Sequence, residues 1–308
     1  MIKNQIALLR REVWEHRTIY VTPVVIALLV ALGALTGSVT LVVNEDIANL
    51  ALIGVTNLQE GHRAAAVSGL LASVLPLFLI PMAIVMTFYA LDSLYAERKD
   101  RSILFWRSLP VTDAETVLSK LLTATILIPL VTIAIIALTQ LVVLVVSSGW
   151  LMARNASPWI LIWKPVPLVQ IWLASAYIAM ASAIWSAPIV GWYLFVSGFA
   201  KRSPLMLAFL PLVVIPLLER LIFKSHYFYS AVANRMKDMP LLKADDLANI
   251  EALLENPESL NQMTGSFSLL KHLDIVGFLS NPGLYIGLIV CGLFVAAAIY
   301  VRRYRDDS

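Results

Sequence analysis

The sequence predicts an all-α membrane protein with six transmembrane helices, and its composition and its charge-free windows predict that fold. Hydrophobic residues make up 59% of the 308 residues and charged residues only 14%, against roughly 25% charged in an average soluble domain. The mean hydropathy is +0.81. Five charge-free windows exceed the roughly 20 residues that a helix needs to cross about 30 Å of hydrocarbon. They cover residues 18–44, 64–91, 121–153, 165–200 and 275–301.

The first 18 residues predict an amphipathic interfacial helix ahead of the first span. Ile2, Ile6, Leu9 and Val13 recur at helical spacing, and four basic residues lie on the other faces. Such a helix binds anionic lipid or contacts a partner protein, and the pattern favours neither interpretation over the other. The polar start differs from a removed signal peptide, so we expect the mature protein to keep it.

A sixth, shorter apolar window covers residues 203–218 and contains three prolines. It reaches the far side of a membrane only if the helix continues through Glu219 and Arg220 to residue 223. We expect a fifth span here. The alternative is a broken helix whose kinks are covered by neighbouring spans, the setting in which membrane proline is tolerated.

The distribution of Lys and Arg predicts the orientation, because short cytoplasmic loops carry an excess of these residues. With six spans, one side holds 14 of the 23, within residues 1–18, 98–120, 201–202 and 302–305. Both termini are therefore expected in the cytoplasm.

The longest polar stretch, residues 224–282, then lies outside. Residues 245–256 within it follow a helical apolar pattern that stops at Pro257, so we expect a small external helical segment between the fifth and sixth spans. This segment, the helix at 1–18 and a cytoplasmic coupling loop at 92–119 all belong to a single transmembrane domain covering residues 1–308.

The sequence lacks the motifs that several functional classes of protein require. No H-x-x-x-H pair occurs, and His226 and His272 have no third ligand at a metal-binding spacing. No G-x-x-x-x-G-K-[ST] motif occurs, so any ATP must be bound by another polypeptide. The lone Cys291 excludes an internal disulfide. We therefore expect no catalytic site, no metal site and no cofactor bound directly by this chain.

Residues 97–120, ERKDRSILFWRSLPVTDAETVLSK, form the densest run of charge. Thr112 and Glu115 match a capping box, which predicts that the third span begins near Asp113. Lys120 is then expected to snorkel to the membrane surface.

Upstream of the capping box, residues 103–106 (ILFW) place four large apolar side chains between Arg101 and Arg107. We expect a short transverse helix here. It either lies in the membrane surface or docks in a groove of a partner, since aromatic and arginine side chains are typical interface anchors.

The pattern YAERKDRSILFWRSLPVTDAETVLSK resembles the cytoplasmic loop of permease subunits in ABC transporters of the type-2 exporter family (ABC-2). In that family a Glu-Arg pair precedes a short coupling helix, a Leu-Pro-Val-Ser/Thr turn follows, and a lysine opens the third span. Glu97 and Arg98, residues 109–112 (LPVT) and Lys120 match these positions. The layout of interfacial helix, six spans and external segment is similar as well. Many members carry a glycine three residues after the arginine of the pair, where this chain has Arg101.

The resemblance implies a permease subunit that exports a hydrophobic or amphipathic substrate across a bacterial cytoplasmic (inner) membrane. Its expected partners are an ABC ATP-binding subunit that carries ATP and Mg²⁺, a second permease copy in a homodimer or heterodimer, and membrane lipid, with no nucleic acid. The expected contacts with the ATP-binding subunit are Glu97, Arg98, Arg101, Phe105, Trp106 and Arg107, with the interfacial helix flanking the same groove. The alternative is a non-transporting membrane component that uses the partner ATPase for mechanical work on an envelope complex.

Overall fold

A computed structural model describes residues 2–43, 46, 49, 52–53, 56, 60–100, 111–237, 239–241 and 269–304. The structure is 89% helical, with no strand among the residues that it describes. Six helices in this part of the chain are long and apolar enough to cross a membrane, which confirms the predicted all-α polytopic membrane fold. They cover Thr18–Thr40, Ala66–Lys99, Asp113–Ala153, Leu168–Trp185, Pro204–Phe223 and Pro282–Tyr304.

Several of these spans are built from two helical elements in succession. A break at Val74 separates α4 (Glu60–Ser73) from α5 (Leu75–Lys99), and a π turn at Thr123–Leu127 joins α7 (Asp113–Leu122) to α8 (Ile128–Ala153). The other elements are α1 (Ile2–Glu15), α2 (Thr18–Val43), a π turn at Trp159–Trp163, α9 (Leu168–Trp185), α10 (Ala187–Phe199), α11 (Pro204–Leu218), a π turn at Glu219–Phe223, α12 (Tyr227–Lys237), α14 (Leu269–His272), α15 (Ile275–Ser280) and α16 (Pro282–Tyr304).

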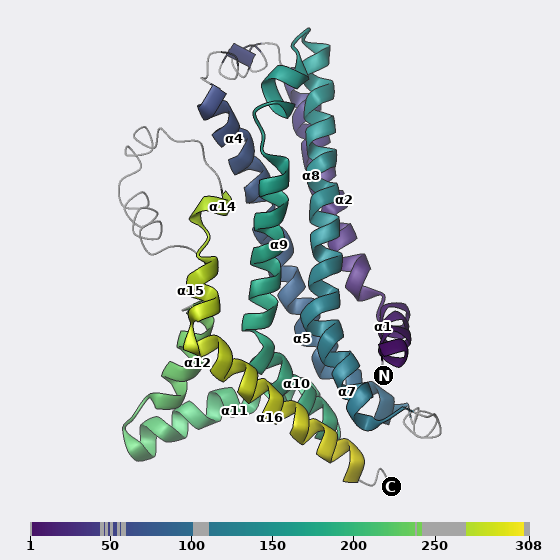
Figure 1. The fold of residues 1–308 in the computed structure, drawn as a ribbon, viewed down its shortest axis with the longest axis vertical. Coiled ribbons are helices and arrows are strands. Elements are labelled where there is room, and N and C mark those ends of the chain that lie inside the picture. The colour runs from purple at the N-terminus through teal and green to yellow at the C-terminus, as the bar shows by residue number, and fades with distance from the viewer. Residues whose placement is uncertain are drawn as a thin grey trace.

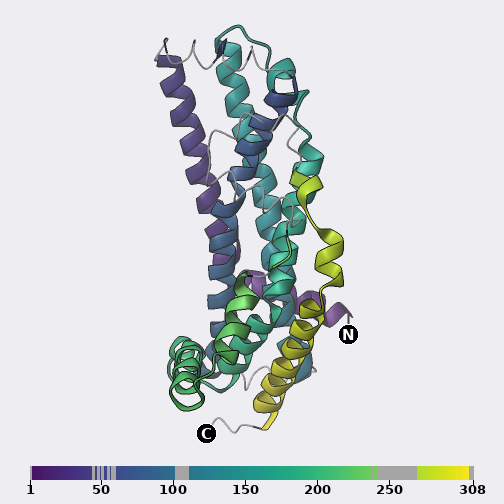
Figure 2. The ribbon, with the colours of Figure 1, turned by 90° about the vertical axis from the view of Figure 1, so that its left-hand side faces the viewer.

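The long helices α2, α5, α8 and α9 run side by side along the long axis of the molecule (Figures 1 and 2). The helices α10, α11 and α16 gather at the lower end of this bundle in Figure 1, where α10 packs against both α5 and α16. The start of α1 and the end of α16 both lie toward this end. We call it the basal end.

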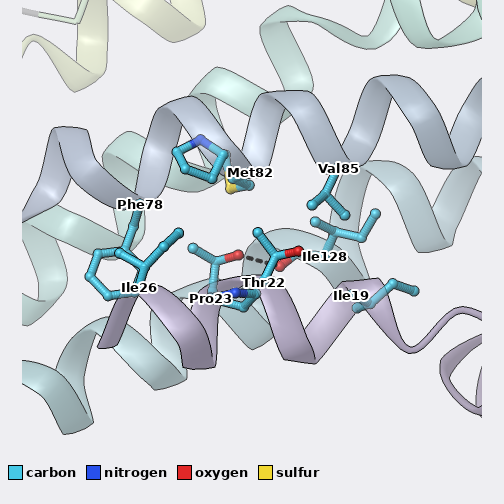
Figure 3. A pocket seen from close by; sticks show the side chains of 10 residues that line it. Ile19, Thr22, Pro23, Ile26, Phe78, Met82, Val85 and Ile128 are labelled. Atoms are coloured by element: carbon cyan, nitrogen blue, oxygen red, sulfur yellow. Dashed lines mark hydrogen bonds between the residues drawn. The ribbon is translucent and has the colours of Figure 1, made fainter. Parts of the chain in front are cut away.

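The packing of α2 on α5 and α8 is apolar and close (Figure 3). Ile19 and Ile26 of α2 face Phe78, Met82 and Val85 of α5. Ile19 and Phe78 are almost completely buried, whereas the opposite side of α2 exposes a continuous row of valine and leucine side chains. An apolar row facing outward is what lipid requires of a spanning helix.

At the break between α4 and α5, a backbone carbonyl receives a hydrogen bond from a neighbouring span. Pro76 cannot donate a backbone hydrogen bond, and helices therefore interrupt near such residues. Gln140 is buried in α8, and its side-chain Nε2 donates to the Leu71 carbonyl at 3.1 Å. A polar side chain from another helix thus replaces the water that is absent from hydrocarbon.

The charge-free window at 165–200 is divided into α9 and α10, which corrects the expectation of a single run. Pro188 again removes a donor, and the Ile189 amide bonds the Ser186 carbonyl at 2.9 Å. Only α9 is long enough to be counted as a span, and α10 is a shorter apolar helix.

Small residues let α10 approach α16 closely. A Cβ atom built on Gly191 would lie 3.2 Å from the Cys291 backbone, and one on Gly198 would lie 3.9 Å from the Ala298 carbonyl oxygen. Such contacts are typical of helix pairs in membranes, where close backbone approach drives association. Cys291 is buried at this contact and serves as a small packing residue.

The helix predicted for the fifth span continues past Glu219 to Phe223, which gives it the length that a span needs. In Figure 1, α11 runs across the lower end of the bundle. The chain then reverses at Lys224, which adopts a left-handed conformation with φ of 50°. The Glu219 carboxylate accepts hydrogen bonds from the amides of Tyr227 at 2.6 Å and Phe228 at 3.0 Å. This acid therefore caps the start of α12.

Two sequence predictions concern residues outside the described ranges. They are the external helix at 245–256 and the transverse helix at 103–106. Within residues 224–282, which were predicted to lie outside the membrane, the structure describes α12, α14 and α15.

Candidate functional site

Charged side chains from four helices meet at the basal end of the bundle. We call this group the basal charge cluster; it consists of Arg11, Glu12, Glu97, Asp113, Lys120 and Arg302. Its three acids and three bases balance in formal charge. The members come from α1, α5, α7 and α16, so the cluster joins the first helix, the last helix and the two helices that flank residues 101–110.

Lys120 lies at the centre of the cluster. Its Nζ lies 3.0 Å from Glu12 Oε1 and 3.0 Å from Glu97 Oε1, and the side chain is only 1% exposed. The sequence prediction that Lys120 snorkels to the membrane surface is therefore wrong. Two buried carboxylates hold the ammonium group inward, because a buried charge is stable only when it is paired.

Arg302, near the end of α16, completes the other side of the cluster. Its Nη1 donates to Glu97 Oε2 at 2.6 Å and its Nε donates to Asp113 Oδ1 at 2.9 Å. Glu97 is thereby engaged by Lys120 and Arg302 together. The end of α5 and the start of α7 are both fixed to α16 through one guanidinium group.

Glu12 connects α1 to the cluster. The carboxylate is 1% exposed and accepts from the Tyr89 hydroxyl at 2.7 Å as well as from Lys120. His16 lies one turn further, with Nε2 3.6 Å from Glu12 Oε2. Burial lowers the pKa of His16 below its ordinary value, although the charge of Glu12 acts in the opposite direction.

The predicted apolar face of α1 is not the face that packs on the bundle. Leu8 and Glu12 are buried, whereas Ile6 is 62% exposed and Leu9 and Val13 are half-buried. The side chain of Ile2 lies outside the described ones. The neighbouring face, which periodicity predicted as the apolar one, exposes Ile6 and is left for lipid or a partner.

Arg98 binds the end of α10. Its Nη2 donates to the carbonyls of Ser197 at 2.6 Å and Ala200 at 2.9 Å. The last carbonyls of a helix lack helical donors, and a cation there also complements the helix dipole. Arg98, like Glu97, is thus engaged inside the chain, and the contact of either residue with an ATP-binding subunit stays a prediction. The other four expected contacts, Arg101, Phe105, Trp106 and Arg107, lie outside the described residues.

The predicted capping box at the start of α7 is confirmed. The Glu115 amide donates to Thr112 Oγ1 at 3.2 Å, and the Thr112 amide donates to Glu115 Oε2 at 3.0 Å. The Glu115 carbonyl also accepts from Gln5 Nε2 at 3.1 Å, which adds a contact with α1. Beside this helix start lies a recess of about 390 Å³ that reaches the exposed Arg303 of α16.

One group of side chains in the described part of the chain has metal-ligating chemistry. Potential ligand atoms of Glu12, Glu15 and His16 lie within 4.8 Å of one another. Both oxygens of Glu12 already accept from Lys120 and Tyr89. The geometry therefore supports an ion-paired cluster that fastens helices.

Sequence reasoning missed the basal partners Glu12, Asp113 and Arg302. One signal was present for Glu12, which lies on one helical face with Leu8, four residues before it. No local signal pairs Glu97 with Arg302, because 205 residues separate them.

Comparisons of the chain with protein-family models, with curated proteins and with solved structures found no match. The fold and the site define a class: an integral membrane protein of six apolar helices. In this chain a buried charge cluster ties the basal ends of those helices together.

Proposed function

We propose that this chain is the membrane-spanning permease subunit of an ATP-driven exporter of the type-2 ABC family. It would couple ATP hydrolysis on a separate subunit to export of a hydrophobic or amphipathic substrate. One observation carries the proposal beyond the resemblance of the loop: the basal charge cluster joins both ends of that loop to α1 and α16.

The cluster provides a route by which a partner acting on the loop would move the membrane helices. Glu97 lies just before the end of α5 and Asp113 is the first residue of α7, and Arg302 bonds both. Breaking a buried ion pair by removing one partner costs about 3–5 kcal/mol. The end of α5, the start of α7 and the end of α16 therefore move as one body, and the Lys120–Glu12 pair takes α1 with them.

The free energy for such a movement would come from ATP on the partner subunit. A closed pair of nucleotide sites binds ATP more tightly than an open pair, and this difference shifts the equilibrium between two arrangements of the spans. This chain would contribute the rigid connection. The free apolar face of α1 with Ile6 lies on the same basal end and would flank the docking groove.

The proposed orientation places the basal end in the cytoplasm of a bacterium, at the inner membrane. The start of α1, the ends of α5 and α16 and the start of α7 gather there. The outward apolar side chains of α2 and α11 would face lipid or a second permease copy.

The test is co-expression with ABC ATP-binding subunits from the source genome. Phe105→Ala/Trp106→Ala should abolish co-purification, whereas Phe88→Ala/Trp159→Ala, a matched pair of exposed aromatic residues away from the loop, should retain it. Absence of any co-purifying ATP-binding subunit, or a complex that survives the loop substitutions, would refute the proposal. A complex whose ATPase activity responds to no small amphipathic ligand, but to an envelope protein bound at 224–282, would favour the mechanical role.

A further inference from the structure

Arg235, near the end of α12, reaches the break between α9 and α10. Its Nε and Nη2 donate to the Trp185 carbonyl at 3.1 and 2.6 Å, and its Nη1 donates to the Gly283 carbonyl at 2.6 Å. The guanidinium group also stacks on the indole of Trp185, with Cζ 3.8 Å from the ring centroid. One side chain of the external segment therefore contacts the end of α9 and the start of α16 together.

The Trp185 carbonyl needs these donors because α9 ends there. In a continuous helix the amide of Ile189 would donate to it, but that amide bonds the Ser186 carbonyl instead. The break lies within a charge-free window of 36 residues, 165–200, and a carbonyl without a donor is costly in such apolar surroundings. Arg235 supplies two donors at this point.

The contact is reciprocal and has neighbours that support it. Trp185 Nε1 donates to the Arg235 carbonyl at 2.6 Å. Phe278 of α15 is buried and packs beside the Trp185 indole, with ring centroids 6.1 Å apart. The amide of Asp274 donates to the Leu241 carbonyl at 3.0 Å, which joins the start of α15 to the chain that follows α12.

Two glycines shape the surface of α16 beneath the guanidinium group. Gly283 and Gly287 are one turn apart, and a methyl group on Gly287 would overlap Arg235 Nη2 and Cζ. Gly292, on the same helix, has open space where its methyl group would lie. The absent side chain of Gly287 thus leaves a notch on α16, and this notch is where the guanidinium group lies.

We propose that Trp185, Gly283 and Gly287 form a receptor site for a guanidinium group. Arg235 fills this site as a latch that holds α12 and α15 against the break between α9 and α10, at the end of the fourth span. The site recognises the cation by the carbonyls of Trp185 and Gly283, by the indole face of Trp185, and by the space left beside Gly287, which has no side chain.

The chemistry of the site selects guanidinium over ammonium. A guanidinium group is a planar fork that donates to several carbonyls at once while its face stacks on an aromatic ring. An ammonium group is a compact, strongly hydrated point charge that can neither span both carbonyls nor fill the flat notch. A free guanidinium compound should therefore bind once Arg235 is removed, whatever substrate the protein handles.

The first test measures amide hydrogen exchange of the purified full chain in lipid nanodiscs. Arg235→Ala and Gly287→Ala should each speed exchange in α12 and α15 by about tenfold or more, since charge-assisted hydrogen bonds hold them. Gly292→Ala is the matched control, because it makes the same glycine-to-alanine change on the same helix without meeting the guanidinium group. It should leave exchange unchanged. Gly287→Ala retains Arg235, so its exchange rates decide the outcome of this first test if Arg235→Ala does not fold.

The second test measures binding at the vacated site. Millimolar methylguanidinium should raise the melting temperature of Arg235→Ala in a saturable way, and methylammonium at the same concentration should not. Wild type and Arg235→Ala/Gly287→Ala should not respond to either compound. Unchanged exchange in both Arg235→Ala and Gly287→Ala, or equal responses of wild type and Arg235→Ala to methylguanidinium, would overturn the proposal.

Discussion

Replacement of Lys120 by methionine tests the central contact of the basal charge cluster. The substitution keeps an apolar stem of similar length and removes the ammonium group that lies 3.0 Å from both Glu12 and Glu97. Removing one partner of a buried ion pair costs about 3–5 kcal/mol. Glu12 keeps the Tyr89 hydroxyl at 2.7 Å and Glu97 keeps Arg302 at 2.6 Å, so we expect the lower figure, about 3 kcal/mol.

The assay is unfolding of the full chain by sodium dodecyl sulfate in bicelles, which yields a free energy of unfolding. Glu12→Gln/Lys120→Met should be more stable than Lys120→Met alone by about 1–2 kcal/mol, because the neutral amide no longer leaves a buried charge without its cation. Lys99→Met, at an exposed position at the end of α5, should stay within about 0.5 kcal/mol of wild type.

Two results would refute this reasoning. One is a Lys120→Met variant as stable as the Lys99→Met control, which would mean that Lys120 reaches water after all. The other is a Glu12→Gln/Lys120→Met variant whose loss in free energy of unfolding equals the sum of the losses of Glu12→Gln and Lys120→Met measured separately. Additivity would show that Glu12 and Lys120 do not interact, since contacting pairs show coupling and independent sites do not.

Three further predictions concern pH, helix packing and capping. Burial lowers the pKa of His16 below its ordinary value of 6.5, so the unfolded chain binds more protons and stability falls as the pH drops below about 6.5. His16→Gln should therefore reduce the dependence of the melting temperature on pH between about pH 7 and 5. A variant whose melting temperature changes with pH as steeply as that of wild type would contradict this. Gly191→Ala should lower the free energy of unfolding by about 1 kcal/mol, because its methyl group would lie 3.2 Å from the Cys291 backbone, whereas Gly33→Ala on the exposed side of α2 should not. Thr112→Ala should cost about 1 kcal/mol in the same unfolding assay by removing the capping box, and Thr112→Ser should restore most of it; equal stability of all three chains would mean that the cap contributes nothing.

The predicted elements that the structure confirms depend on neighbours in the sequence. The length of a charge-free window decides whether a helix can cross a membrane, and all six spans appear where these windows lie. The capping box at Thr112 and Glu115 needs only residues three apart, and it forms as expected. The prolines in the fifth span left its continuity open, and the helix continues to Phe223.

The candidate site depends on tertiary structure. Lys120 was expected at the membrane surface because its sequence neighbours place it near the start of the third span. It is buried because Glu12, 108 residues away in the chain, lies beside it. Periodicity indicated the face of α1 that is left for lipid or a partner. It did not indicate that the face with Glu12 packs on the bundle, where Lys120 and Tyr89 bind the carboxylate.

By itself, the sequence determined an all-α membrane protein, the number of its spans and the start of α7, because hydrophobic length, charge spacing and capping act over a few residues. Only the tertiary structure decided that α9 and α10 separate at Ser186, that Arg235 fills the break, and that Glu97 bonds Arg302 across 205 residues. In apolar surroundings each buried charge and each carbonyl freed by a break must find a partner. Which partner it finds depends on how the helices pack.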